Sequence, residues 1–117
     1  MRERRIRSLA DAIELLTETH AARETAVLWA ASDEEGGLWL TAVLDAARSA
    51  VPGADGRVAL SCGDRAGDAM AALRAGIRRI AFTGSDEVAA KLTALGAELA
   101  ELPPDFSVPI ATIRRGG

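Results

Sequence analysis

The architecture of this chain can be predicted outward from VALSCGDRAG, residues 58–67. The stretch begins with apolar residues typical of a buried β-strand and runs into a glycine-rich turn that carries the carboxylate of Asp64. IAFTGSD, residues 80–86, repeats this design further along the chain. Apolar strands that end in small polar residues and then open a helix are typical of α/β proteins, which form binding sites at such strand ends.

Hydrophobic spacing divides the rest of the chain into alternating helices and strands. Apolar residues recur at steps of three and four over residues 4–20, which predicts a first helix. Gly76 and Gly96 stand where helix C-caps belong. The full pattern predicts helices at residues 4–20, 38–50, 67–75 and 85–95, and strands at residues 25–31, 57–61, 77–82 and 97–102.

This alternation with short connections predicts an α/β fold, a small three-layer sandwich in which helices cover both faces of a four-stranded parallel sheet. The preferred strand order is flavodoxin-like, 2-1-3-4. The alternative is a fragment of a β/α barrel, with the strands side by side in chain order and open edges that need partners. Residues 1–102 then form one domain, and residues 103–117 form a proline-rich tail. Within the tail, residues 110–113 predict an edge strand of this subunit or of a neighbouring one.

Composition limits the classes of function. The chain has 117 residues, of which 49% are hydrophobic, and a net charge of −3, which fits one globular domain and argues against a nucleic-acid-binding protein. Cys62 is the single cysteine, so an intrachain disulfide is impossible and a reducing compartment is expected. The sequence has neither an apolar run of membrane-spanning length nor the core of a signal peptide. These features predict a soluble cytoplasmic protein without nucleic-acid or membrane partners.

An apolar stripe marks the predicted first helix and consists of Ile6, Leu9, Ile13 and Leu16. Such a stripe fits a helix docked on its own domain, and it also fits a dimer seam. His20 follows near the helix end, where a positive charge interacts favourably with the helix dipole. Because it is the only histidine and no cysteine lies nearby in sequence, His20 is interpreted as a helix-end residue rather than a metal ligand.

The predicted binding residues gather where parallel strands end, because ligands bind at the carboxyl edge of such sheets. In the 2-1-3-4 order, a crevice lies between the first and third predicted strands. Its expected lining is Ser32, Asp33, Thr83, Gly84 and Ser85, with Gly63 to one side.

The turn at residues 83–85 has two interpretations. Gly84 lets the backbone approach an anion, and the helix start offers free N–H groups. Alternatively, Ser85 is a helix N-cap, and Asp86 and Glu87 are first-turn acids that match the helix dipole and repel phosphate. The capping interpretation is preferred.

Asp64 is the candidate catalytic residue, because a carboxylate after a buried strand can act as an acid or a base. It could instead cap the next helix or pair with Arg65 or Arg74. Cys62 would need a base nearby to act as a nucleophile, and it is interpreted as a buried small hydrophobe. The sequence predicts no metal site and no cofactor.

Residues 58–86 resemble part of a known family. SCGD at residues 61–64, AMAALRAG at 69–76 and RIAFTGS at 79–85 are similar to a β-α-β segment of class II sugar-bisphosphate aldolases. In that family a strand ending in an acid–His–Gly turn leads to a helix ending Ala-Gly and a strand ending Asp-Gly-Ser. The resemblance implies β/α-barrel architecture with phosphate binding at Gly84 and Ser85.

The catalytic residues of the aldolases have no counterpart here. No histidine stands in these loops to hold zinc, and Lys91, the only lysine, lies in a predicted helix rather than on the strand that carries the Schiff-base lysine of class I aldolases. We therefore expect a non-catalytic α/β domain that acts through self-association or partner binding, as a homo-oligomer formed through the first helix or the tail. The alternative is an enzyme or binder of a small phosphorylated metabolite at the carboxyl edge, with Asp64 as acid or base.

Overall fold

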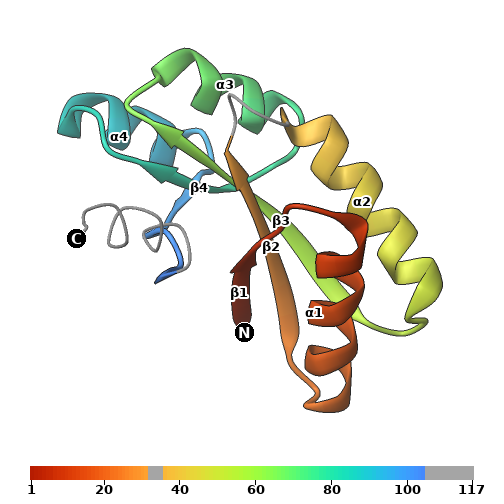
Figure 1. Ribbon diagram of the computed structural model, residues 1–117. Helices are drawn as coiled ribbons and strands as arrows, with labels where there is room; N and C mark the ends of the chain where they lie inside the picture. Colours follow the sequence, from red (N-terminus) through yellow and green to blue (C-terminus); the bar gives the residue numbers. More distant parts are fainter. Residues whose placement is uncertain (32–35, 105–117) are drawn as a thin grey trace, which may run out of the picture.

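A computed structural model describes residues 1–31 and 36–104 as a parallel sheet with its connecting helices (Figure 1). Every helix and strand predicted from residue 25 onward is present; the first of them, the strand at residues 25–31, has its predicted ends, and the others have shifted ends. The elements are β1 (Arg2–Arg5), α1 (Leu9–Ala21), β2 (Thr25–Ala31), α2 (Gly36–Ala50), β3 (Asp55–Gly63), α3 (Ala66–Arg74), β4 (Arg79–Phe82), α4 (Asp86–Ala94) and β5 (Glu98–Leu99). None of the helices in this described part is both long and apolar enough to cross a membrane. Residues 110–113, the predicted edge strand, lie outside the described residues.

The strands pair in chain order, β1-β2-β3-β4-β5, and every pairing is parallel. The predicted order 2-1-3-4 is therefore wrong, and the described sheet has five strands instead of the four that were expected. The observed order is the one that the alternative arrangement, a β/α-barrel segment, requires. In a doubly wound sheet the direction of winding reverses, and here it does not.

The helices cover one face of the sheet, so the expected three-layer sandwich is also wrong for the described residues. Consecutive right-handed crossovers that advance in one direction place each helix on the same side. Figure 1 shows the helices following one another along that side. A single apolar core joins all of them to the strands, with members that include Leu16, Leu40, Ala72 and Leu92 from the helices and Leu28, Leu60 and Ile80 from the strands.

The N-terminal segment is a strand and not the start of the first helix. Arg2–Arg5 pairs with β2, and Ile6 continues the ladder by donating its N–H to the Trp29 carbonyl at 2.8 Å. Helix α1 begins only at Leu9, after the N-cap Ser8. The prediction of helix over residues 4–8 is therefore wrong. Four consecutive charged residues give no apolar alternation that would predict a strand.

Arg2, Glu3 and Arg4 of β1 form ion pairs within the chain. Side chains alternate across a strand, so Arg2 and Arg4 extend toward α1 while Glu3 extends to the other face. Arg4 pairs with Glu18 at 3.0 Å, and Arg2 pairs with the same carboxylate at 3.3 Å. The hydrogen bond from Arg4 holds the pKa of Glu18 below its usual range. Each of these partly exposed ion pairs contributes little to the stability of the fold. Together they neutralise the charges of β1 where the strand faces α1.

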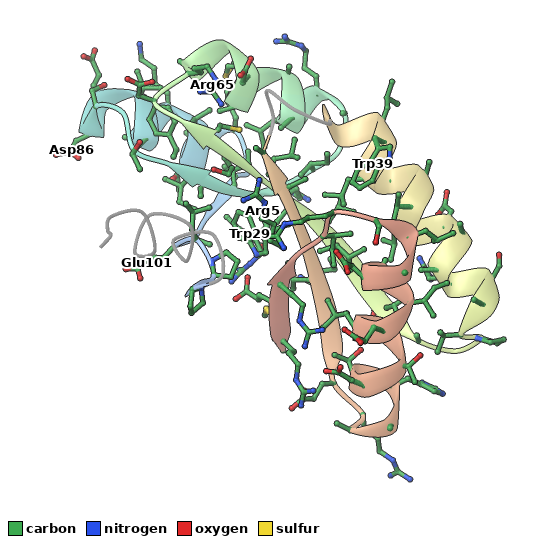
Figure 2. The ribbon with its side chains drawn as sticks, in the orientation of Figure 1. Arg5, Trp29, Trp39, Arg65, Asp86 and Glu101 are labelled. Atoms are coloured by element: carbon green, nitrogen blue, oxygen red, sulfur yellow. The ribbon has the colours of Figure 1, made fainter. Side chains whose placement is uncertain are left out.

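The face of the sheet opposite the helices carries a charged network around Trp29, a residue labelled in Figure 2. We call it the helix-free face, since no described helix covers it. The register places Trp29, Ala59 and Arg79 side by side on β2, β3 and β4. Arg79 extends to β1, where its Nε and Nη2 donate to the two oxygens of Glu3 at 2.9 and 3.0 Å. Trp29 Nε1 donates to the same carboxylate at 2.9 Å.

This network surrounds a second, smaller apolar cluster. The cluster consists of Val27, Trp29, Ala59 and Ala81, and Ala100 packs against it. The hydrogen bond from Arg79 holds the pKa of Glu3 below its usual range, and the bond from Trp29 acts in the same direction against the effect of burial. The same pair raises the pKa of Arg79. Both groups are therefore charged at neutral pH.

We expect Glu3→Gln to lower the free energy of unfolding by about 1–3 kcal/mol at neutral pH, because Arg79 and Trp29 lose a charged acceptor. The pKa of Glu3 is lower in the folded chain than in the unfolded one. Its contribution is therefore complete above the ordinary glutamate value of 4.5 and is lost as the pH falls through the folded-state pKa. Urea unfolding at a series of acidic pH values measures this fall in the free energy of unfolding. The fall should be smaller in Glu3→Gln than in the wild type.

The matched control is Glu14→Gln, on the exposed side of α1, where we expect a change below about 0.5 kcal/mol. Equal losses in the two variants would contradict the role assigned to Glu3.

Candidate functional site

The crevice expected at the carboxyl edge does not form in this strand order. It required the strands at residues 25–31 and 77–82 to be neighbours, but β3 lies between β2 and β4. Two parallel strands separated by a third are roughly 10 Å apart. Ser32 and Asp33 lie outside the described residues. Among the predicted site residues, those that the structure brings together come from the ends of β3 and β4 instead.

Gly63 and Thr83 join these two strand ends. The pairing of β3 with β4 shifts by one residue between Ser61 and Gly63, which marks a β-bulge. Gly63 has φ of 56°, in the left-handed region that favours glycine, and its carbonyl accepts the N–H of Thr83 at 2.8 Å. The bulge thus ends β3 and turns the chain toward α3.

Asp64 projects from this turn and is exposed. Within residues 1–31 and 36–104 its carboxylate makes no hydrogen bond and no ion pair. The N-cap of α3 is Arg65 and has no side-chain capping bond, while Arg65 Nε donates to Asp68 at 2.6 Å. The capping and Arg65-pairing interpretations of Asp64 are therefore wrong, and its role as an acid or base stays a prediction. Cys62 is completely buried in the helix-side core, as predicted.

The turn before α4 is a helix cap. Ser85 Oγ accepts the N–H of Val88 at 3.2 Å, and Asp86 and Glu87 stand in the first turn, as the capping interpretation predicted. Gly84 lies against the ring of Phe82, which a Cβ at this position would overlap. An anion here would meet a hydroxyl already engaged in the cap and two exposed carboxylates.

The predicted interface residues are largely part of the chain's own core. Ile6 and Leu16 are buried, and Ile13 packs against the same cluster. Leu9 is exposed at the start of α1. The stripe therefore serves mainly to dock α1 on the sheet, and a role of Leu9 in self-association stays a prediction.

His20 lies in the last turn of α1, as the helix-end interpretation predicted, and it is exposed. It borders a polar hollow of about 490 Å3 between α1 and the start of β3, together with residues that include Glu24 and Asp55. The described part of the chain contains no group of three or more histidine, cysteine, aspartate or glutamate residues placed to hold a metal ion.

Three arginines at the opposite, amino-terminal edge of the sheet were not among the predicted site residues. Arg57, Arg78 and Arg79 stand at the starts of β3 and β4 and line a hollow of about 270 Å3 with Glu98 of β5. In the sequence they could have been recognised only as arginines near the starts of two predicted strands, β3 and β4, which are adjacent in the structure.

Comparison of the chain with protein-family models, curated protein sequences and solved structures finds no match in any of the three. The likeness of residues 58–86 to an aldolase segment therefore stays a prediction. In the structure these residues form a β-α-β unit with Gly76 just after the helix, at φ of 91°. This geometry is common to β/α repeats in general.

We expect Ser85→Ala to lower the free energy of unfolding by about 1 kcal/mol, because the Val88 N–H loses its capping acceptor. Asp64→Ala should change it by less than about 0.5 kcal/mol, because no described group depends on that carboxylate. Denaturant unfolding of both variants beside the wild type measures the difference. A loss at Asp64 equal to that at Ser85 would contradict the description of Asp64 as an exposed side chain without a structural partner.

Proposed function

We propose that this protein acts by associating with another protein chain, namely a second copy of itself, and not by catalysing a reaction. The supporting observation is where large apolar side chains are exposed. Among the described residues they occur mainly at the two ends of the sheet: Met1 and Leu9 at the first strand–helix unit, and Leu95, Leu99 and Leu102 at the last. Exposed apolar residues that gather at an unpaired end of a sheet favour a contact with another surface.

The β1 end is poorly suited to that contact. An edge strand rich in charged residues resists the addition of another strand. Arg2, Glu3 and Arg4 all have ion-pair partners within the chain, and separating them would cost stability. Association at this end would have to disrupt pairs that already stabilise the subunit.

The β5 end is better suited. Strand β5 has two residues, so it offers little backbone for strand addition, and contact there would use side chains. Leu99 lies on the helix side in register with Ile80, yet it keeps 39% of its surface exposed, and β5 is the last strand of the described sheet. A two-fold axis beside β5 would bring the same leucines of two copies together, as an isologous dimer requires.

We expect the wild-type protein to sediment as a dimer at low micromolar concentration. Leu99→Glu should weaken the dimer at least about tenfold, since it places a carboxylate in an apolar contact. Sedimentation velocity over a concentration series measures the change. Leu95→Glu is the second variant, and it should act in the same direction.

The matched control is Leu38→Glu on α2, a residue that is 88% exposed but belongs to a middle helix. It should leave the dimer unchanged. A wild-type monomer at all concentrations would reject the proposal. Dissociation by Leu38→Glu but not by Leu99→Glu would reject the β5 end as the interface.

The second candidate function is binding of a phosphorylated metabolite at the carboxyl edge. It is favoured by the Gly63–Thr83 hydrogen bond, which holds two exposed turns side by side next to Asp64. In an amide NMR titration with a phosphorylated sugar, this function requires shifts at residues 83–86 and 63–64. Shifts confined to other parts of the chain would exclude it.

A further inference from the structure

No described helix lies over the helix-free face, yet the centre of this face is buried. Val27, Trp29 and Ala59 have none of their surface exposed, and Ala81 keeps only 4%. An indole ring on the face of a sheet and an alanine beside it lose all their exposed surface together only where other atoms lie above them. Parallel sheets normally have such a covering layer on both faces. The second layer of this sheet must therefore come from something other than its helices.

The chain after β5 leads to this face. Ala100 donates its N–H to the Ile80 carbonyl at 2.9 Å and packs against the apolar cluster around Trp29. In Figure 1 the blue end of the chain leaves the sheet on the side opposite α3 and α4. Pro103 is buried there, although Pro104 is exposed. The described chain therefore ends beside the face that needs a cover.

Residues 105–117, which follow Pro104 and which we call the tail, are long enough to cross this face. Strand β2, which carries Trp29, is three strand spacings away from β5, or roughly 14 Å. Because an extended chain advances about 3.3 Å per residue, about five residues cover that distance. The first part of the tail can therefore reach Trp29.

The same part of the tail has one apolar side. Phe106, Val108 and Ile110 alternate with Ser107 and Pro109. Alternate side chains of an extended segment point to the same side, so the three large apolar groups can contact one surface together. Pro109 has no N–H to donate to a neighbouring strand, which favours contact through side chains over addition to an edge.

The charges of the two surfaces also match. Arg5 is in register with Trp29, as Figure 2 labels them, and it extends to the same face as Glu3. The tail begins with Asp105, which carries the opposite charge. An acidic residue followed by alternating apolar ones thus complements a face where an arginine borders an apolar cluster.

We propose that residues 105–110 lie across the helix-free face of their own chain, with Phe106, Val108 and Ile110 against the cluster around Trp29. A tethered segment has an effective concentration on the order of millimolar, so it outcompetes the tail of a second copy present at micromolar concentration. This surface is distinct from the contact proposed at the β5 end and does not rest on it. A protein that sediments as a monomer would still have it.

Acrylamide quenching of Trp29 fluorescence tests this docking. Trp39→Phe removes the other tryptophan and gives the reference protein, in which Trp29 should be poorly quenched. In that background Val108→Asp should raise the quenching constant at least about twofold, because a carboxylate is excluded from an apolar contact and the tail leaves the ring. Phe106→Ala is the second variant and should act in the same direction.

The matched control is Ser107→Asp, which adds the same charge on the opposite side of the extended segment. It should change the quenching constant by less than about 1.3-fold. Strong quenching of the reference protein, unchanged quenching in both Val108→Asp and Phe106→Ala, or equal increases in Val108→Asp and Ser107→Asp would each overturn the proposal.

A nitroxide label on Ser107→Cys separates the chain's own tail from the tail of a second copy. Cys62 is fully buried, so the label reacts with the introduced thiol. When chains that carry both the nitroxide and the NMR isotope are diluted with unmodified chains, amide signals of residues 27–29 and 59 should broaden, whereas those of α2 should keep their intensity. Broadening only when the nitroxide and the isotope are on different chains would overturn the proposal in favour of a second copy. Absence of broadening at these residues in both samples would also overturn it.

Discussion

The ion pair between Glu3 and Arg79 joins the first strand to the fourth across the helix-free face of the sheet, although the two residues are 76 positions apart in sequence. A parallel sheet is normally buried by helices on both faces. Here the four helices of residues 1–31 and 36–104 shield one face, and charged side chains that pair with one another surround the apolar cluster on the other. Strand β1 lies at the edge of the described sheet, and its alternating charges have ion-pair partners on both faces.

The two edges of the sheet differ in their electrostatics. Each helix begins near the carboxyl edge, where first-turn acids stabilise the helix dipole, and Asp68, Asp86 and Glu87 follow that rule. Helix ends and strand starts face the amino-terminal edge, where Arg57, Arg78 and Arg79 gather. Arg78, for example, donates its Nε to the Gly96 carbonyl just after α4, where a cation matches the negative end of the helix dipole. The association proposed at β5 would use a third region, the last strand of the described sheet.

Much of the local structure was predictable. Strand β2 spans the predicted residues 25–31, and the Ser85 cap with its first-turn acids was expected from local chemistry. Gly76 and Gly96 follow their helices with positive φ, as predicted. The burial of Cys62 and the position of His20 at the end of α1 were also expected. In each case the deciding interaction lies within a few residues in sequence.

The amino-acid sequence by itself determined which segments form helices, where they are capped, and that the sheet is parallel, because periodicity, capping and short crossovers are local properties. Only the tertiary structure decided the strand order, the conversion of Arg2–Arg5 into a strand and the grouping of Arg57 with Arg79. Each of these depends on pairs far apart in the chain, such as Glu3 with Arg79, and on which neighbour each strand selects. A local pattern carries no information about that choice, because both winding directions use the same alternation of strands and helices.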